Sequence, residues 1–279
     1  MAEELHDANF PMIGTKTMHL NVSKGNVANR ILSVGDHGRA QRLAALLDGG
    51  QPEATTPSTR GFIVHSGHFK GVPVSVVGTG MGTPMMDFVV RECRHVVEGP
   101  MAIVRYGTTG LLRESLGPGT VLLAKSSRML SRNYDYDPSD SASQAYRLSN
   151  RVAADAHLTA LVKEKLTTVL GEENVAEGVD ITADFFYDTQ GRTGPMFQDY
   201  NEGLIDRLET LEPEASNLQM ETFKLLQLAS VSQGSVKAAG AAIGLMNRKS
   251  QSVLSEALLI QRETEGGRAI LDALASFPL

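Results

Sequence analysis

Short apolar runs that lead directly into glycine-containing turns restrict the fold of this chain more than any other feature. Met101–Val104 is such a run, and it suits a strand buried on both faces of a sheet. It continues into Arg105, whose guanidinium keeps its charge, and then into Gly107–Gly110, which reads Gly-Thr-Thr-Gly. Strands of this kind alternate with amphipathic helices along the chain. The pattern predicts an α/β fold.

The predicted elements follow one another without a linker, a repeat or a low-complexity tract, so we expect one domain over residues 1–279. The predicted strands are Arg30–Val34, Arg60–Gly67, Val72–Val77, 101–105, Thr120–Lys125, Val179–Ala183 and Val236–Met246. The predicted helices are 40–47, 84–97, 151–170 and 252–274, the last with an interruption at Gly266-Gly267. A further helix is predicted to begin at a Ser216-x-x-Gln219 capping box and to end near Ser230. We expect polar loops at 51–59 and 131–150, and an N-terminal arm at 1–29 that packs on a partner subunit.

The Gly-Thr-Thr-Gly segment is a candidate binding loop. We expect it at the C-terminal edge of the sheet, where open α/β sheets bind ligands. Its glycines let the backbone approach a ligand, and its N–H groups and hydroxyls suit an anionic or hydroxylated one. Arg39 opens a predicted helix after the turn at Gly35-Asp36, which is a second place for an anion. Taken alone, the segment fits equally well a tight loop in which Arg105 only caps a sheet edge.

The glycine-rich run Gly78–Gly82 resembles part of the dinucleotide-binding fingerprint. The last glycine of that fingerprint is replaced by Thr83. No acidic residue stands convincingly about 20 positions further on, where the fingerprint has its ribose ligand. We therefore exclude an NAD site.

Charge and composition exclude several other classes. The net charge of −6 argues against a protein that binds nucleic acid or an anionic membrane through bulk charge. No apolar run approaches the ~18 residues of a membrane span, and the N-terminus has no signal-peptide pattern, so we expect a cytoplasmic protein without a membrane partner. The single cysteine, Cys93, excludes an internal disulfide and a thiolate cluster, and we expect it buried as a small hydrophobe.

Several short motifs stand along the chain in an order and at spacings that are typical of one protein family. They are Gly35-Asp36-x-x-Arg39, Gly78-Thr79-Gly80-Met81-Gly82, Arg105-x-Gly107-Thr108-Thr109-Gly110 and Met220-Glu221-Thr222. In this respect the chain resembles the nucleoside phosphorylase family, from about His19 to its final helix. Within that family, Phe186–Arg192 resembles the F-Y-x-x-Q-x-R segment of the uridine phosphorylases. The resemblance implies a single-domain α/β fold with a mixed central sheet flanked by helices.

The resemblance implies phosphorolysis, in which a phosphate dianion is held beside the anomeric carbon of a ribosyl group. The implied phosphate-binding residues are Gly35, Arg39, Arg60, Arg105 and Thr108. Guanidinium groups bind phosphate through forked, charge-assisted hydrogen bonds, which agrees with three arginines in the set. Arg60 would reach the site from a neighbouring subunit. Taken singly, each arginine is more often half of a surface ion pair.

The implied ribose-binding and catalytic residues are His19, Met220 and Glu221. The Glu221 carboxylate would accept hydrogen bonds from the ring hydroxyls and lie near the charge of an oxocarbenium-like transition state. We expect it in the first turn of a helix, with Met220 offering an apolar surface to the ribose. His19 would contact the 5′-hydroxyl from the adjacent subunit, so the resemblance implies at least a homodimer with shared active sites.

The implied uracil-binding residues are Gly110, Phe186, Gln190 and Arg192. The Gln190 amide and the Arg192 fork match the O2, N3–H and O4 edge of uracil, and Phe186 would stack on the ring. Purine-specific relatives usually carry an aspartate near the end of the strand before the last helix. The corresponding segment here, Gly244–Arg248, has no carboxylate, which favours a pyrimidine.

Two departures from the family pattern concern the phosphate loop and a metal site. His37 stands where the family usually has proline. Bacterial relatives often carry, after Arg60, a glutamate that binds an interface potassium ion, whereas this chain has Gly61. We therefore predict no metal site and no required cofactor, with inorganic phosphate as co-substrate, while another interface cation stays an open alternative.

The sequence thus predicts reversible phosphorolysis of uridine to uracil and α-D-ribose 1-phosphate, a reaction of pyrimidine salvage. The alternatives are a purine nucleoside phosphorylase, a nucleosidase, or a nucleoside-binding protein without catalysis. The missing aspartate and the Gln190–Arg192 pair disfavour the purine enzyme. A nucleosidase has no use for three phosphate-facing arginines, and a binding protein would have lost at least one of these groups.

Overall fold

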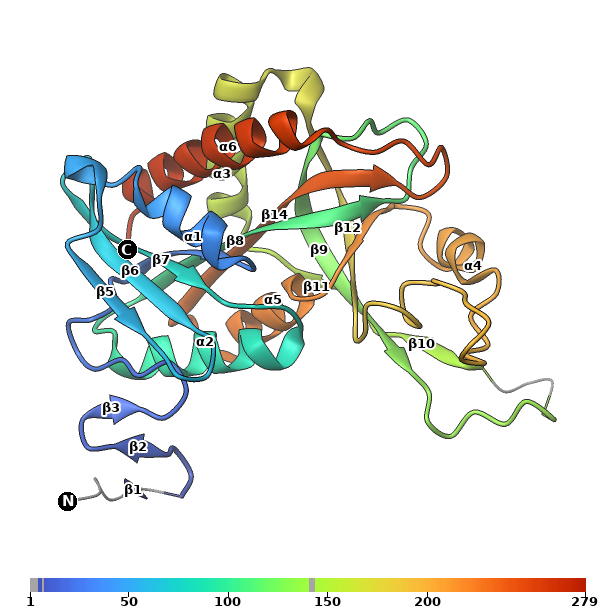
Figure 1. The fold of residues 1–279 in the computed structure, drawn as a ribbon, viewed down its shortest axis with the longest axis horizontal. Helices are drawn as coiled ribbons and strands as arrows, with labels where there is room; N and C mark the ends of the chain where they lie inside the picture. The colour runs from blue at the N-terminus through green and yellow to red at the C-terminus, as the bar shows by residue number, and fades with distance from the viewer. Residues whose placement is uncertain (1–4, 7, 141–143) are drawn as a thin grey trace.

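The computed structural model describes residues 5, 6, 8–140 and 144–279, and its strands and helices alternate along the chain (Figure 1). The strands are β1 (Leu5–His6), β2 (Met12–Ile13), β3 (Lys16–Thr17), β4 (Arg30–Val34), β5 (Ala54–Pro57), β6 (Ile63–Phe69), β7 (Val72–Gly78), β8 (Met101–Leu111), β9 (Val121–Arg132), β10 (Tyr146–Leu148), β11 (Val152–Ala153), β12 (Val175–Ala183), β13 (Ala215–Gln219) and β14 (Val236–Asn247). The helices are α1 (His37–Ala44), α2 (Thr83–Val96), α3 (Ala156–Leu170), α4 (Leu204–Leu211), α5 (Thr222–Val231) and α6 (Glu256–Ser276), with short 3₁₀ turns at Asp48–Gly50 and Glu172–Asn174.

Within the described residues, eleven strands form one mixed sheet in the order β10-β9-β12-β13-β8-β4-β7-β6-β5, with β11 paired to β9. β14 pairs in parallel with β8 and antiparallel with β9. Because β8 also pairs with β13, β13 with β12 and β12 with β9, these five strands close into a ring. The mixed sheet predicted from the sequence is therefore confirmed.

Helices cover both faces of the sheet, with α1, α3 and α6 on one side and α2 and α5 on the other (Figure 1). One apolar cluster joins α1, α3 and α6 to the sheet and includes Val104. A second cluster joins α2 and α5 to the opposite face and includes the neighbouring Ile103. Successive residues of a strand point to opposite faces, so the Met101–Val104 run is apolar throughout because both faces are covered.

The Gly107–Gly110 segment is the most consequential difference from the sequence prediction, because it is not a loop but the second half of β8. Its backbone groups pair with two other strands: Thr109 lies opposite Gly244 of β14, and Gly110 lies opposite Leu218 of β13. Glycine and threonine give no local signal of a partner strand. The segment still lies at the C-terminal end of β8, the end predicted to bind a ligand.

The capping-box prediction was wrong. Ser216 and Gln219 belong to β13, and the Ser216 hydroxyl donates to the backbone carbonyl of Val179 on the adjacent strand. The following helix, α5, begins only at Thr222. Gln219 does cap this helix, however, because its side-chain oxygen accepts hydrogen bonds from the first N–H groups of the helix turn. Ser216, the N-cap of the predicted box, therefore does not cap the helix, and Gln219 accepts these N–H groups from the end of a strand.

Both predicted polar loops contain strand structure. Residues 51–59 include β5, which pairs with β6, and residues 131–150 include the end of β9 and all of β10. Residues 141–143 of the second loop lie outside the described residues. The helix predicted from residue 151 begins at Ala156, where Asp155 accepts a hydrogen bond from the Leu158 N–H as N-cap. The strands β5 and β10 stand at the two ends of the strand order, and their alternation is too short to stand out in the sequence.

Helix α6 is continuous, so the predicted interruption at Gly266-Gly267 was wrong. Both glycines are buried where the helix meets its neighbours. A Cβ on Gly266 would overlap the Tyr106 hydroxyl, and one on Gly267 would overlap the Leu43 side chain. The glycines are therefore explained by close packing and not by a break in the helix. No helix in the described part of the chain is long and apolar enough to cross a membrane.

We expect Gly266→Ala to destabilise the protein, although alanine is the better helix former by about 1 kcal/mol. The added methyl group must displace Tyr106, whose hydroxyl donates to the Arg262 carbonyl at 2.6 Å, and overpacking of this kind costs about 1–3 kcal/mol. Urea unfolding measures the change. Arg268→Ala, on the exposed face of the same helix, is the control and should leave the midpoint nearly unchanged. A more stable Gly266→Ala variant would contradict the packing explanation.

Candidate active site

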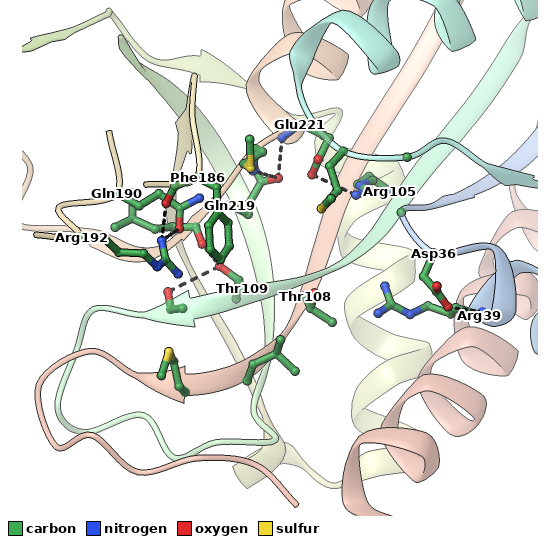
Figure 2. A pocket seen from close by; sticks show the side chains of 18 residues that line it. Asp36, Arg39, Arg105, Thr108, Thr109, Phe186, Gln190, Arg192, Gln219 and Glu221 are labelled. Atoms are coloured by element: carbon green, nitrogen blue, oxygen red, sulfur yellow. Dashed lines mark hydrogen bonds and ion pairs between the residues drawn. The ribbon is translucent and has the colours of Figure 1, made fainter. Parts of the chain in front are cut away.

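A pocket of about 390 Å³ opens at the C-terminal end of β8. It is lined by Gly35, Asp36, Arg39, Gly80, Met81, Arg105, Thr108, Thr109, Gly110, Phe186, Gln190, Arg192, Leu218, Gln219, Met220, Glu221, Leu245 and Met246. These residues come from the turns after β4, β7 and β12, from the first turn of α1, from β8, β13 and β14, and from the start of α5. Every predicted site residue except His19 and Arg60 lies here, and Figure 2 shows the labelled side chains around one space.

One end of the pocket is cationic and is built at the start of α1. Asp36 is the N-cap of α1 and accepts a hydrogen bond from the Arg39 N–H at 2.6 Å. The Arg39 guanidinium is anchored behind the pocket by Glu263, with 2.7 Å between Nε and Oε1. Glu263 also pairs with Arg42, which lies 4.0 Å from the Asp36 carboxylate as well, so the charges of these four side chains balance. The Arg39 guanidinium at the pocket and the N–H groups at the start of α1 favour an anion.

Arg105 is buried, with 4 % of its surface exposed, and it extends the cationic end toward the middle of the pocket. Its Nη2 lies 2.9 Å from Oε2 of Glu221. Among the described residues, its Nε and Nη1 atoms are buried and have no hydrogen-bond partner. Leaving buried donors unsatisfied costs about 1–3 kcal/mol each, which an acceptor-rich ligand would relieve. A Cβ on Gly35 would lie 3.0 Å from Arg105 Nη2 and 3.3 Å from the Gly80 carbonyl oxygen, so a side chain here would require the guanidinium to shift.

Glu221 occupies the middle of the pocket, also with 4 % exposed surface. It is the N-cap residue of α5 and not part of the first turn, where we had predicted it. Its side chain turns away from the helix: Oε1 accepts a hydrogen bond from the Gly82 N–H at 2.6 Å, and Oε2 faces Arg105 (Figure 2). The Gly78–Gly82 run, which we excluded as a nucleotide-binding loop, therefore holds the carboxylate.

The opposite end of the pocket is formed by the segment after β12. Arg192 Nη1 donates to the Gln190 side-chain oxygen at 2.7 Å and to the Phe186 carbonyl at 2.6 Å. The guanidinium carbon of Arg192 lies 3.8 Å from the centre of the Phe186 ring, a cation–π contact. Gln190 and Arg192 thus form one planar polar surface with an aromatic ring beside it (Figure 2).

Arg248 is a residue near this end that the sequence interpretation missed. Its side-chain carbons lie 3.4 Å from where a Cβ on Gly110 would be, and among the described residues its buried Nη1 has no hydrogen-bond partner. Burial lowers the pKa of Arg248, and burial together with the charge of Arg248 lowers the pKa of Arg192. Two crowded guanidiniums would be stabilised by an electron-rich acceptor. Arg248 directly follows the apolar strand β14, as Arg105 follows its own apolar run, and this signal could have identified it.

His19 and Arg60 lie together outside the pocket of their own chain. The His19 imidazole stacks on Phe88 with 4.0 Å between ring centres, and its Nδ1 is 2.6 Å from a Glu92 carboxylate oxygen. The Ser58 hydroxyl donates to the His19 carbonyl and accepts from the Arg60 N–H. The two residues, 41 positions apart, therefore share one surface. Among the described residues, no group of three or more His, Cys, Asp or Glu side chains is arranged to hold a metal.

A family model and a solved structure both match most of this chain. A family model described as the phosphorylase superfamily matches residues 29–257. A solved structure from a structural and catalytic analysis of two uridine phosphorylases of the oomycete Phytophthora capsici is 39% identical, with a TM-score of 0.95, over 99% of this chain and 100% of that chain.

Two further relatives differ in their nucleoside. A uridine phosphorylase of Thermococcus kodakarensis is 27% identical over 76% of this chain and 72% of the relative. A DeoD-type purine nucleoside phosphorylase of Geobacillus kaustophilus is 30% identical over 62% of this chain and 69% of the relative. The overall likeness therefore leaves the choice of base to the residues at the Gln190–Arg192 end of the pocket.

Proposed function

The chain belongs to the phosphorylase superfamily, and from this we propose that it is a uridine phosphorylase. It transfers the ribosyl group of uridine to inorganic phosphate and releases uracil and α-D-ribose 1-phosphate. The observation that carries the proposal is the order of charges along one pocket. Arg39 and Arg105 form the cationic end, Glu221 lies in the middle, and the Gln190–Arg192 pair forms the other end.

The cationic end binds phosphate. The unpartnered Nε and Nη1 of Arg105, the Arg39 guanidinium, the Thr108 hydroxyl and the backbone at Gly35 supply donors to its oxygens. A phosphate oxygen attacks the anomeric carbon of the ribose on the face opposite the base and forms the new C–O bond. No cofactor is required, because phosphate itself is the nucleophile.

The middle of the pocket binds the ribose. Glu221 accepts hydrogen bonds from the ring hydroxyls and places negative charge beside the oxocarbenium-like transition state. As the C1′–N1 bond breaks, its electron pair leaves with the base and spreads onto the uracil carbonyl oxygens. Gln190 and Arg192 line that end, with the charge of Arg248 close to Arg192, and they stabilise the anion, which needs no general acid.

The base end favours a pyrimidine over a purine. No carboxylate stands in Gly244–Arg248, where Leu245 and Met246 line the pocket instead. Protonation of a purine would need an acid there, whereas crowded guanidiniums suit carbonyl oxygens. Pocket residues Arg39 and Arg105 also favour phosphate over water as the nucleophile.

The test follows uridine cleavage by the ultraviolet change of the free base, with and without inorganic phosphate, beside inosine and thymidine. Phosphate-dependent release of uracil, with little base from inosine, is the expected result. Release without phosphate would make the protein a hydrolase. Faster cleavage of inosine would make it a purine phosphorylase, and no release from any nucleoside would favour a binding protein.

The active unit in this proposal is at least a dimer, because His19 and Arg60 lie outside the pocket of their own chain and complete that of a neighbour. Mixed oligomers test this arrangement. Arg60→Ala and Glu221→Gln homo-oligomers should each be nearly inactive. An oligomer that contains one chain of each kind has one site with both native residues and one site with neither, so we expect about half the wild-type activity per dimer.

Differently tagged chains, co-expressed and purified over both tags, provide the mixed oligomer. A mixture of the two separately purified homo-oligomers, assayed before subunits exchange, is the control. If the mixed oligomer is no more active than this control, each site is complete within one chain and the shared-site proposal is wrong.

A further inference from the structure

Asp180 is a buried acidic residue on β12 that the proposed reaction does not use, and 2 % of its surface is exposed. Four neutral side chains donate hydrogen bonds to it. Ser127, Gln219 and Thr182 donate to Oδ1 at 2.6, 2.7 and 2.9 Å, and Asn217 donates to Oδ2 at 2.7 Å. Burial raises the pKa of Asp180, whereas these four donors favour its carboxylate form. A buried carboxylate without a cationic partner is costly, so its presence needs an explanation.

The Gln219 side chain connects Asp180 to the pocket. Its Nε2 donates to Asp180 and to the Thr182 hydroxyl, at 2.7 and 2.6 Å. Its Oε1 accepts from the N–H groups of Met220 and Glu221 at 2.8 and 2.7 Å, and more weakly from the next N–H at 3.2 Å. A carboxylate only accepts, so Asp180 determines which end of the amide faces the helix. A flipped amide would point its NH₂ group at backbone N–H groups.

A second arm of the same cluster reaches β8. Asn217 Nδ2 also donates to the Thr109 hydroxyl at 3.1 Å, and Thr109 donates in turn to the Leu218 carbonyl at 2.6 Å. The pairing of β12 with both of its neighbours shifts register at Val179, next to Asp180. Irregularities of this kind are frequent near active sites, where they redirect a side chain. The hydrogen-bonded cluster around Asp180 thus joins β8, β9, β12 and β13, and it includes Thr109 and Gln219, which line the pocket.

We propose that Asp180 is a positioning residue for the ribose site: by fixing the Gln219 amide, it holds Met220 and Glu221 where they meet the nucleoside. The inference rests on the proposed function, because it uses the role given there to Glu221. Asp180 itself touches neither substrate nor reacting atoms.

A reciprocal exchange of the two side chains tests this role. Asp180→Asn can keep an oxygen toward Ser127, Thr182 and Gln219 by turning its NH₂ group toward the Asn217 NH₂ group, so this change weakens the cluster and leaves the Gln219 amide an acceptor. Gln219→Glu places two carboxylates face to face. A displacement of about 1 Å at an active site can cost about 100-fold in rate, and we expect a loss of this size in kcat/KM for uridine from Gln219→Glu and a smaller loss from Asp180→Asn.

The double variant Asp180→Asn/Gln219→Glu restores an amide–carboxylate hydrogen bond between the two positions, with donor and acceptor exchanged. The amide at position 180 donates to the carboxylate at position 219, whose other oxygen still accepts the backbone N–H groups. We expect kcat/KM to return to within about tenfold of wild type, a coupling that a double-mutant cycle measures directly. A purely structural role would lower stability in all three variants without this recovery.

Ser127→Ala is the matched control, because it removes one donor to Asp180 from β9 and leaves the Gln219 amide in place. Its thermal midpoint should fall while kcat/KM stays within about twofold. The inference is overturned if folded Gln219→Glu retains wild-type kcat/KM, or if the double variant is no better than Gln219→Glu alone. A wild-type chain that does not cleave uridine overturns the proposed function as well, so the two failures are distinct.

Discussion

Replacing Arg105 by alanine should lower kcat/KM for phosphate by about 1000-fold, the size of effect seen when one preorganised donor to a charged transition state is lost. Arg105 is the one residue in contact with the Glu221 carboxylate that also has buried donors left without partners within the described residues. Its removal takes away phosphate ligands and leaves the Glu221 carboxylate without its cation. The expected loss is therefore larger than that of a surface ion pair.

Initial rates at saturating uridine and varied phosphate measure this effect. Arg91→Ala is the control, because Arg91 is exposed on α2 and pairs with Asp87 one helical turn away. Circular dichroism before the assay establishes that the Arg105→Ala chain is folded. A folded variant with kcat/KM within about threefold of wild type would contradict the role given to Arg105.

Replacing Glu221 by glutamine should lower kcat by about 100-fold or more. The substitution keeps the shape of the side chain and an oxygen that can accept from the Gly82 N–H, but it removes the negative charge beside the ribose. The substitution should therefore destabilise the transition state more than it weakens the binding of uridine. In kinetic terms, we expect kcat to fall more than the KM for uridine rises.

Glu98→Gln, an exposed side chain after α2, is the control for the loss of one carboxylate. An unchanged kcat in the Glu221→Gln variant would mean that the carboxylate does not stabilise the reacting sugar. The double variant Arg105→Ala/Glu221→Gln adds a further check. Since the two side chains pair at 2.9 Å, their effects should not be additive, and the double variant should lose less than the product of the two single losses.

The pocket is held together by contacts between residues that lie far apart in the sequence. Gly82 and Glu221 are 139 positions apart, and their hydrogen bond closes the middle of the site. Arg39 and Glu263 are 224 positions apart, and their ion pair fixes the cationic end. Both contacts are between residues on different elements, so the site depends on correct packing of α1, α5 and α6 against the sheet.

The alternation of strands and helices could be predicted from the sequence, and the family resemblance predicted most of the residues that line the pocket. Met101–Val104 is apolar at every position, which requires a strand covered on both faces, and the structure confirms this. Arg105 and Thr108 follow this run, so the topology of an α/β sheet brings them to its C-terminal edge. A local pattern was enough for these two residues because strand direction places them, whereas Glu221 was identified through the family resemblance.

Features that depend on contacts between distant segments could be seen only in the folded chain. Gly107–Gly110 is a strand because β13 and β14 satisfy its backbone groups, and Gly266 is required because Tyr106 lies against the helix. Asp180 and Arg248 acquire their importance from burial beside particular donors and charges. The hydrophobic periodicity of a segment predicts which of its faces is buried and which is exposed to water. Its hydrogen-bond partners and close contacts depend on a second segment, so they cannot be predicted from the pattern of one segment alone.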